Sequence, residues 1–276
     1  MNSIAIICSS TDAAGLNIKS SLARLGFEKS KESFESSHVF SYNSKDFSAK
    51  LYTTEKDIIF FDGMEQLDED FIVFISKHQS AQGVASLTMH ATGNWAEAEA
   101  GGVSREVSVS WPAFIRESFA WLLLNAGDNG MEITPEVTHH GPLVMKPHAF
   151  IEIGSSEEHW KNERLGELIA RAVLNTLEKI FSPEYKLGYK VAFAIGGPHY
   201  CNNLRKAFLS DEFAVSHACP KYYTEGLNEE MIRMAMERSV PKVEVVILDW
   251  KGIPNRQDIK ALLEKMGIDY IKLKKI

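Results

Sequence analysis

The chain of 276 residues contains few cysteines and no long apolar run, and both absences limit what it can be. Its three cysteines, Cys8, Cys201 and Cys219, are too few and too irregularly spaced for a disulfide framework. No CxxC pair is present, which argues against a closed zinc site built from thiolates. No apolar run approaches the roughly 20 residues of a membrane-spanning helix, and the N-terminus lacks the pattern of a signal peptide. We therefore expect a cytoplasmic protein.

Several common motifs of enzymes and nucleotide-binding proteins are also missing. The sequence contains neither GxGxxG nor GxxxxGK[ST], the glycine-rich loops that bind dinucleotides and nucleotide phosphates. It lacks the GxSxG turn of serine hydrolases and the HExxH helix of thermolysin-like metalloproteases. These absences argue against a nucleotide-binding protein with either glycine-rich loop, a serine hydrolase of the GxSxG type and a thermolysin-like metalloprotease.

Basic residues are outnumbered, and the formal net charge is -7. This balance argues against general coating by nucleic acid, because phosphate binding depends on clustered lysine and arginine. A net charge of -7 is still compatible with a local basic surface. For any single basic residue, however, an ordinary position on the solvent-exposed surface is the simpler explanation. The candidates for such a surface are Lys161, Arg164, Arg205, Lys206, Lys272, Lys274 and Lys275.

Strand-like apolar segments alternate with helical patterns along the chain. Strands are expected at 3–8, 38–42, 49–53, 71–75, 86–89, 136–140, 150–153, 190–195, 213–217, 243–250 and 270–274. Helices are expected at 16–25, 111–125, 155–181, 229–238 and 256–266, with a short helix after Cys201. The alternation predicts an α/β fold with a mixed, mostly parallel sheet. We expect one compact unit over 1–276, with possible lobes 81–225 and 1–80 together with 226–276.

Histidines gather in three stretches, each beside glycine at the end of an apolar run. The stretches are His90-Ala91-Thr92-Gly93-Asn94-Trp95, Thr138-His139-His140-Gly141-Pro142 and Gly196-Gly197-Pro198-His199-Tyr200. In a sheet of this kind, functional side chains lie at the C-terminal ends of strands, so we expect one shared site. Two adjacent histidines in a strand point to opposite faces, unless the chain bends at Gly141-Pro142. The ordinary alternative is a histidine that only packs in the core.

Glu152 is the acidic residue of interest, because it stands in the apolar run 150–153. A carboxylate buried in such a run costs free energy unless it is paired, hydrogen-bonded or bound to a metal. The alternative is that the strand face carrying Glu152 is exposed to solvent. Phe150 lies on the same face, and an apolar aromatic residue there favours burial. Farther on, Ser155 and Glu158 have the spacing of a helix capping box, so a structural role is sufficient for Glu158.

Imidazole and carboxylate groups together suit two kinds of chemistry. They can bind zinc with an open position for water, whose pKa the metal lowers toward neutrality. Without a metal, the same groups can act as general acid and base. The residue types leave these two alternatives open.

Four motifs, taken in order, resemble the archaeal and plant type of D-aminoacyl-tRNA deacylase. They are LTMHATGNWAEAEAGG (87–102), THHGP (138–142), FIEIGSSEEHW (150–160) and GGPHY (196–200). The resemblance extends over most of the chain. It implies a three-layer α/β fold related to phosphorylase and peptidyl-tRNA hydrolase-like proteins, with a smaller α/β lobe. It also implies a zinc-dependent, cytoplasmic monomer that hydrolyses the ester between a D-amino acid and the terminal ribose of tRNA, in chiral proofreading.

The resemblance places the family's motif histidines on His90, His139, His140 and His199, and its strand glutamate on Glu152. We expect His90, His139, His199 and Glu152 as Zn²⁺ ligands, and His140, Glu152 and Asn94 as catalytic groups. Water activated by metal or base would attack the ester, and Asn94 would hold the substrate carbonyl or amine. The aminoacylated 3′ end of tRNA is the expected partner, with no membrane and no stable protein partner. The alternatives are a zinc-dependent peptidase or amidohydrolase on a phosphorylase-like fold, and a non-catalytic RNA-binding protein.

Overall fold

The computed structural model describes residues 2–79 and 83–276, which form two compact units. The first unit contains Met1–Met89, Glu117–Ile133 and His148–Tyr185. The second unit contains His90–Arg116, Thr134–Pro147 and Lys186–Ile276. These segments differ from the expected lobes 81–225 and 1–80 with 226–276, and the expected boundary between 80 and 81 lies outside the described residues.

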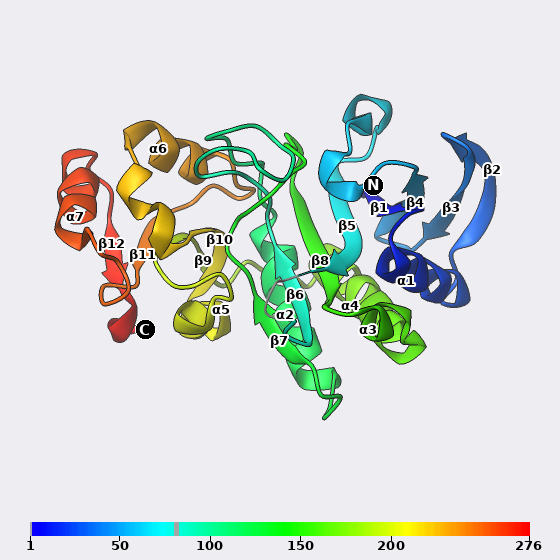
Figure 1. Ribbon diagram of the computed structural model, residues 1–276. Coiled ribbons are helices and arrows are strands. Elements are labelled where there is room, and N and C mark those ends of the chain that lie inside the picture. Colours follow the sequence, from blue (N-terminus) through cyan, green and yellow to red (C-terminus); the bar gives the residue numbers. More distant parts are fainter. Residues whose placement is uncertain (1, 80–82) are drawn as a thin grey trace. The chain divides into compact units, whose positions relative to one another are not determined.

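The first unit is built on an eight-stranded sheet with strand order β2-β3-β4-β1-β5-β8-β6-β7 (Figure 1). Its strands are β1 (Asn2–Ser9), β2 (Glu28–Phe34), β3 (Ser37–Asn43), β4 (Phe47–Thr54), β5 (Phe71–His78), β6 (Ser86–His90), β7 (Glu132–Pro135) and β8 (His148–Gly154). Strand β1 pairs in parallel with β4 and β5, and Ile6 lies opposite both Leu51 and Val73. Residues 4–8 are fully buried, as expected for a central strand of a parallel sheet that is covered on both faces.

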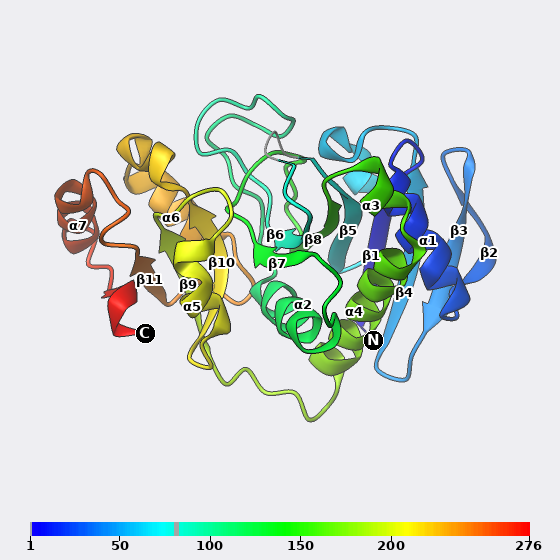
Figure 2. The same cartoon turned by 60° about the horizontal axis from the view of Figure 1, so that its bottom comes forward.

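Helix α1 (Ala13–Arg24) packs against helix α4 (Glu163–Phe181) beside this sheet (Figure 2). Asp12 caps α1, because its carboxylate accepts hydrogen bonds from the backbone N–H groups of Ala14 and Gly15. Helix α2 (Pro112–Asn125) begins in the second unit and ends in the first. Its Pro112 occupies the first turn, where no backbone N–H is needed.

The single helix expected over 155–181 is wrong, because the chain forms two helices there. Helix α3 (Glu157–Lys161) is capped by Ser156, which accepts from His159 N–H, so the capping box expected for Ser155 and Glu158 is also wrong. Asn162 is extended and ends α3, and its side chain then caps α4 by accepting from Arg164 N–H. The asparagine therefore explains the break.

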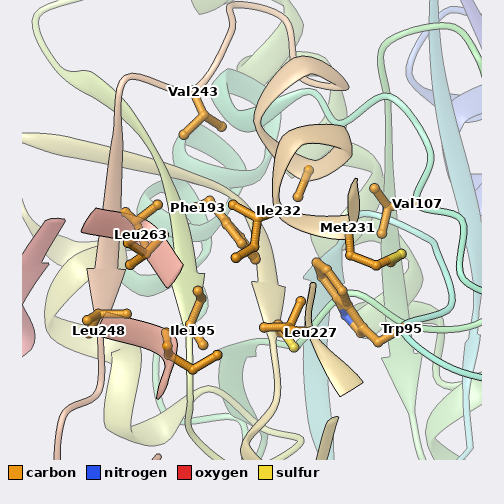
Figure 3. Close-up of a cluster of buried hydrophobic side chains, with 14 of the residues drawn as sticks. Trp95, Val107, Phe193, Ile195, Leu227, Met231, Ile232, Val243, Leu248 and Leu263 are labelled. Carbon is orange, nitrogen blue, oxygen red and sulfur yellow. The ribbon is translucent and has the colours of Figure 1, made fainter. Parts of the chain in front are cut away.

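The second unit contains a parallel four-stranded sheet of order β10-β9-β11-β12. Its elements are β9 (Lys190–Ile195), α5 (Arg205–Leu209), β10 (Phe213–Cys219), α6 (Glu229–Glu237), β11 (Val245–Leu248), α7 (Arg256–Lys265) and β12 (Tyr270–Lys272). Figure 3 shows its core, in which Trp95 stacks on Phe193 at 5.5 Å between ring centroids. Met231 of α6 and Leu263 of α7 complete the same cluster. Because all four strands run in parallel, their C-terminal ends meet at one edge.

Short 3₁₀ turns connect these elements at Ile58–Phe60, Gly63–Gln66, Asn202–Leu204, Lys221–Gly226 and Leu273–Lys275. The architecture is a three-layer α/β fold with a mixed, mostly parallel sheet and a second, parallel sheet. The alternation in the sequence predicted the α/β class and the mixed, mostly parallel sheet, and the family resemblance implied the three layers. None of the helices formed by residues 2–79 and 83–276 is long and apolar enough to cross a bilayer.

The strand expected at 136–140 is wrong. The strand is β7 (Glu132–Pro135), and residues 136–140 form bends and isolated bridges. A positive φ of 43° at His140 turns the chain at the end of this stretch. The sequence also gave no sign of β2, because most of its residues are polar and exposed.

Candidate active site

Main-chain hydrogen bonds hold three separate segments of the second unit side by side. Val137 N donates to His199 O at 3.0 Å, which ties the turn after β9 to the stretch after β7. Gly93 N donates to His140 O at 2.9 Å, which ties the segment after β6 to the same stretch. Gly93 has a φ of +149°, and a Cβ there would lie 2.5 Å from Val107 Cα, so only glycine fits this close approach. The three histidine stretches therefore meet.

The rings of four histidines form one cluster around His139. Its ring centroid lies 4.3 Å from that of His90, 4.4 Å from that of His140 and 4.6 Å from that of His199. His90 and His140 are 4.9 Å apart by the same measure. The structure thus brings together every histidine that the motifs singled out.

The adjacent histidines share this cluster instead of facing opposite ways. The expectation of opposite faces required a strand, whereas the left-handed backbone at His140 redirects the chain after His139. A residue other than glycine in this region costs free energy, which the surrounding contacts must offset. Both rings consequently lie in one site.

Glu136 is a residue of this site that the sequence analysis missed. Its side chain is fully buried, and Oε2 lies 3.9 Å from His90 Nε2 and 3.7 Å from His139 Nε2. Its Oε1 lies 3.8 Å from His199 Nε2. Glu136 precedes the THHGP motif by two residues, and this proximity to His139 and His140 is the one sign of it in the sequence.

Backbone carbonyls fix the tautomer of three of the imidazoles. Nδ1 of His90 lies 3.1 Å from the carbonyl oxygen of the next residue, and Nδ1 of His140 lies 2.6 Å from that of the next residue. Nδ1 of His139 lies 2.9 Å from the carbonyl oxygen two residues before it. A carbonyl only accepts, so Nδ1 carries the hydrogen in each ring and Nε2 is the basic nitrogen of the neutral form.

The environment keeps His139 neutral. Burial lowers its pKa well below the usual value, and the neighbouring rings of His90, His140 and His199 lower the pKa further. A neutral imidazole has a lone pair for a proton or for a metal ion, whereas a protonated one has none. At neutral pH His139 is therefore competent for either role.

The donor set fits a zinc ion. Tetrahedral ligands at roughly 2.0–2.1 Å from zinc lie about 3.4 Å from one another. Ring nitrogens of His90, His139 and His140 lie within 4.8 Å of one another, and those of His90, His139 and His199 lie within 3.9 Å of the Glu136 carboxylate. His90 and His139 belong to both sets.

Asn94 has its amide nitrogen engaged by the loop that follows it. Nδ2 donates to Gly101 O at 2.9 Å and to Val103 O at 3.3 Å. An amide nitrogen has two hydrogens, so both are used within the protein. The remaining polar atom, Oδ1, only accepts hydrogen bonds.

Glu152 lies in the first unit and is buried and hydrogen-bonded there, as expected for a carboxylate in an apolar strand. Its Oε1 accepts from Ser76 Oγ at 2.8 Å, and its Oε2 accepts from Thr88 Oγ1 at 3.2 Å. His78 Nδ1 lies 3.5 Å from Oε2. His78 is itself buried, with an exposed fraction of only 4%.

Cys201 and His217 are both buried in the second unit. Burial and the nearby Glu136 charge raise the pKa of the Cys201 thiol well above its usual value, so it stays protonated. His217 uses both ring nitrogens, because Nδ1 lies 3.1 Å from Thr138 Oγ1 and Nε2 lies 2.9 Å from Arg238 O.

Three imidazoles around a buried carboxylate, with a fourth beside them on an α/β scaffold, form a site typical of hydrolases that activate water. The family model for D-aminoacyl-tRNA deacylase matches residues 65–271. The D-aminoacyl-tRNA deacylase of Pyrococcus furiosus is 36% identical over 97% of this chain and 98% of its own. That of Methanosarcina mazei is 34% identical over 98% of this chain and 92% of its own.

A solved crystal structure of a conserved protein of unknown function also matches. It has a TM-score of 0.85 and 29% sequence identity, and the match covers 100% of this chain and 96% of that one. The chain belongs to the D-aminoacyl-tRNA deacylase family, which confirms the resemblance seen in the four motifs and makes the protein an ester hydrolase.

Proposed function

We propose that the histidine cluster of the second unit hydrolyses the ester bond of D-aminoacyl-tRNA and releases the free D-amino acid and tRNA. The observation that carries this proposal is the convergence of His90, His139 and His199 on the buried Glu136 carboxylate, with His140 beside them. Family membership supports the substrate, because the relatives named above are D-aminoacyl-tRNA deacylases.

Water is a sufficient nucleophile for this reaction. An aminoacyl ester is already activated, so attack requires a base, stabilisation of the negative charge on the acyl oxygen, and correct positioning. His140 is the base in this account, because its Nδ1 hydrogen is held by a carbonyl and its Nε2 can accept the proton of water. The carboxylate of Glu136 stabilises positive charge that develops on the surrounding rings.

We propose that His90, His139 and His199 hold a Zn²⁺ ion and that Glu136 holds or orients it with them. The nitrogen–oxygen distances of 3.7–3.9 Å support this set. When bound, zinc would lower the pKa of water and polarise the ester carbonyl. Replacement of His199 or of His140, followed by measurement of bound zinc, decides which imidazole completes the set.

Asn94 is proposed to contact the amino group of the substrate. Its amide hydrogens are engaged by Gly101 and Val103, so Oδ1 accepts a hydrogen bond from a protonated amine and Nδ2 does not bind the carbonyl. Because the α-amino group is fixed relative to the ester, such a contact contributes to chiral selection.

We also propose a catalytic or metal-binding role for Glu152. We further propose that the fold is related to phosphorylase and peptidyl-tRNA hydrolase-like proteins and that the protein acts in the cytoplasm as a monomer. For Glu152, the buried hydrogen bonds from Ser76 and Thr88 support a carboxylate held in one fixed position.

Hydrolysis of paired D- and L-aminoacyl-tRNA substrates by the purified chain tests the function. We expect rapid release of the D-amino acid, slow release of the L-amino acid, and loss of activity in a chelator that added zinc reverses. Cleavage of short peptides in preference to D-aminoacyl-tRNA would instead support a peptidase, and tRNA binding without turnover would support a non-catalytic RNA-binding protein.

A further inference from the structure

A pocket of about 330 Å³ lies in the second unit, at the C-terminal edge of β11 and β12. Its lining includes Lys206, Trp250, Lys251, Lys272, Leu273 and Lys274. Four lysines therefore face one acidic side chain, that of Asp249, in a chain whose net charge is -7. The pocket is a local positive region on an acidic protein.

The single acidic group of the pocket is engaged by the protein. Asn203 Nδ2 donates to Asp249 Oδ2 at 3.0 Å. A Cβ at Gly252 would lie 2.1 Å from that same oxygen, so the carboxylate is packed directly against the glycine backbone. Asp249 is buried, whereas Lys206, Lys251 and Lys274 are exposed. The lysines consequently dominate the charge that a ligand meets.

Trp250 provides a flat apolar surface in the pocket. It packs against the hydrophobic core of the second unit, which fixes the plane of its ring. Lys272 Nζ lies 3.6 Å from the ring centroid and Arg256 Cζ lies 5.8 Å from it, so cation–π contacts hold positive charge next to the indole. Aromatic surface combined with lysine is the pairing that binds single-stranded nucleic acid, through base stacking and phosphate contacts.

The pocket is close to the proposed active site along the chain. Strand β9 ends at Ile195, and the turn after it carries first His199 and then Asn203, which lines the pocket. Four residues span at most roughly 14 Å even when fully extended. A substrate whose ester lies at the histidine cluster therefore has its adjacent nucleotides within reach of the lysines.

We propose that this pocket binds a nucleotide of the single-stranded 3′ end of tRNA, next to the terminal aminoacylated nucleotide. The phosphate contacts Lys206, Lys251 and Lys274, and the base packs against Leu273 and the part of the Trp250 ring that Lys272 leaves uncovered, while Lys272 adds positive charge beside both. This inference rests on the proposed function and names a binding surface for its substrate. It assigns roles to Lys251 and Trp250, which the sequence analysis had not singled out.

A second pocket of the same unit offers a matched contrast. It is larger, about 680 Å³, and lies at the opposite edge of the sheet, where β9 and β10 begin. Lys190 is accompanied there by Glu212 and Glu244, so its charge does not favour phosphate. Substitution of Lys190 therefore changes the same charge on the same sheet without touching the proposed nucleotide site.

The test compares Lys206→Glu and Lys272→Glu with the control Lys190→Glu. Anisotropy titrations with labelled, deacylated tRNA measure binding without turnover. We expect each pocket variant to weaken binding roughly tenfold or more, since contacts to charged groups contribute about 1.5–3 kcal/mol.

Replacing one lysine by a neutral residue, as in Lys206→Gln, should make the slope of log affinity against log salt shallower by about 0.7. Trp250→Ala should weaken binding, and Trp250→Phe should restore most of it.

Kinetics with two substrates distinguishes failure of this inference from failure of the proposed function. KM for D-aminoacyl-tRNA should rise in the pocket variants with little change in kcat, while hydrolysis of a D-aminoacyl ester of adenosine stays unchanged. Unchanged tRNA binding in both lysine variants would overturn the pocket assignment, as would equal losses on the two substrates. Displacement of tRNA by adenosine monophosphate as effectively as by unlabelled tRNA would instead identify a free nucleotide as the ligand. A wild-type chain that binds tRNA through the pocket but hydrolyses neither substrate would contradict only the proposed function.

Discussion

Glu136 Oε2 lies 3.7 Å from Nε2 of His139, three residues later in the chain, and the carboxylate is fully buried. The same carboxylate lies within 3.9 Å of His90 and His199. A carboxylate in this position fixes the orientation of several imidazoles and raises their affinity for a cation, whether a proton or a metal.

Glu136→Gln should lower the rate of D-aminoacyl-tRNA hydrolysis by about 10–100-fold and weaken zinc binding by a similar factor. The amide keeps the volume of the side chain but removes its charge. The measurements are single-turnover rates and zinc content after dialysis. Glu244→Gln, an exposed change in the same unit, is the control. Equal activity of the Glu136→Gln variant and the wild type would contradict the role of this carboxylate.

Metal removal should abolish most of the activity, and added zinc should restore it. His90→Ala should lose bound zinc, because His90 belongs to both imidazole sets that fit the ion. His217→Gln should keep zinc, because both nitrogens of His217 are used by Thr138 and Arg238. Full activity of a zinc-free chain would support a mechanism by general acid and base alone.

His217 should make stability depend on pH in the acid range. Burial lowers its pKa from 6.5 to about 4. Between these values the unfolded chain binds a proton at His217 and the folded chain does not, so the free energy of unfolding falls as pH drops from 6.5 toward 4. A shift of this size corresponds to at most about 3 kcal/mol.

Denaturant titrations at several pH values measure this dependence. His217→Gln should flatten the decrease between pH 6.5 and 4, although it also lowers stability at neutral pH because the hydrogen bond to Arg238 O is lost. Identical slopes for wild type and His217→Gln would be the contrary result.

Gly93→Ala should disturb the site without touching any ligand. An added Cβ would lie 2.5 Å from the Val107 backbone, and φ at this position is +149°. The contact of Gly93 N with His140 O would shift, so we expect a loss of stability on the order of 1–3 kcal/mol and a lower kcat. The control is Gly188→Ala, where an added Cβ meets nothing within 4 Å. Wild-type stability and activity of Gly93→Ala would show that the segment tolerates movement.

The sequence predicted the elements with strong apolar patterns and missed those that depend on tertiary contacts. Strand β9 was expected at its observed bounds, because residues 190–195 form a short apolar run between turn residues. Strand β2 carries no such pattern and forms through pairing with β3. The break between α3 and α4 depends on Asn162, which caps α4. The sequence pattern there is helical on both sides of Asn162, so the pattern alone predicts one continuous helix.

The sequence also predicted only part of the site. It singled out the four histidines but missed the carboxylate of Glu136, which lies among them. Motif order and neighbouring glycines singled out His90, His139, His140 and His199, which lie together. Glu136 was missed because it was expected at the start of a strand, where an exposed acidic residue is ordinary. Its importance becomes visible only when the turn after β9 brings His199 beside it.

The central claim is that the histidine cluster around Glu136 carries out the hydrolysis of D-aminoacyl-tRNA. The most direct measurement is the single-turnover rate of His139→Gln, compared with that of His217→Gln at matched thermal stability. We expect a rate at least about 100-fold below wild type for His139→Gln and a nearly unchanged rate for His217→Gln. A folded His139→Gln variant that hydrolyses D-aminoacyl-tRNA at the wild-type rate would contradict the claim.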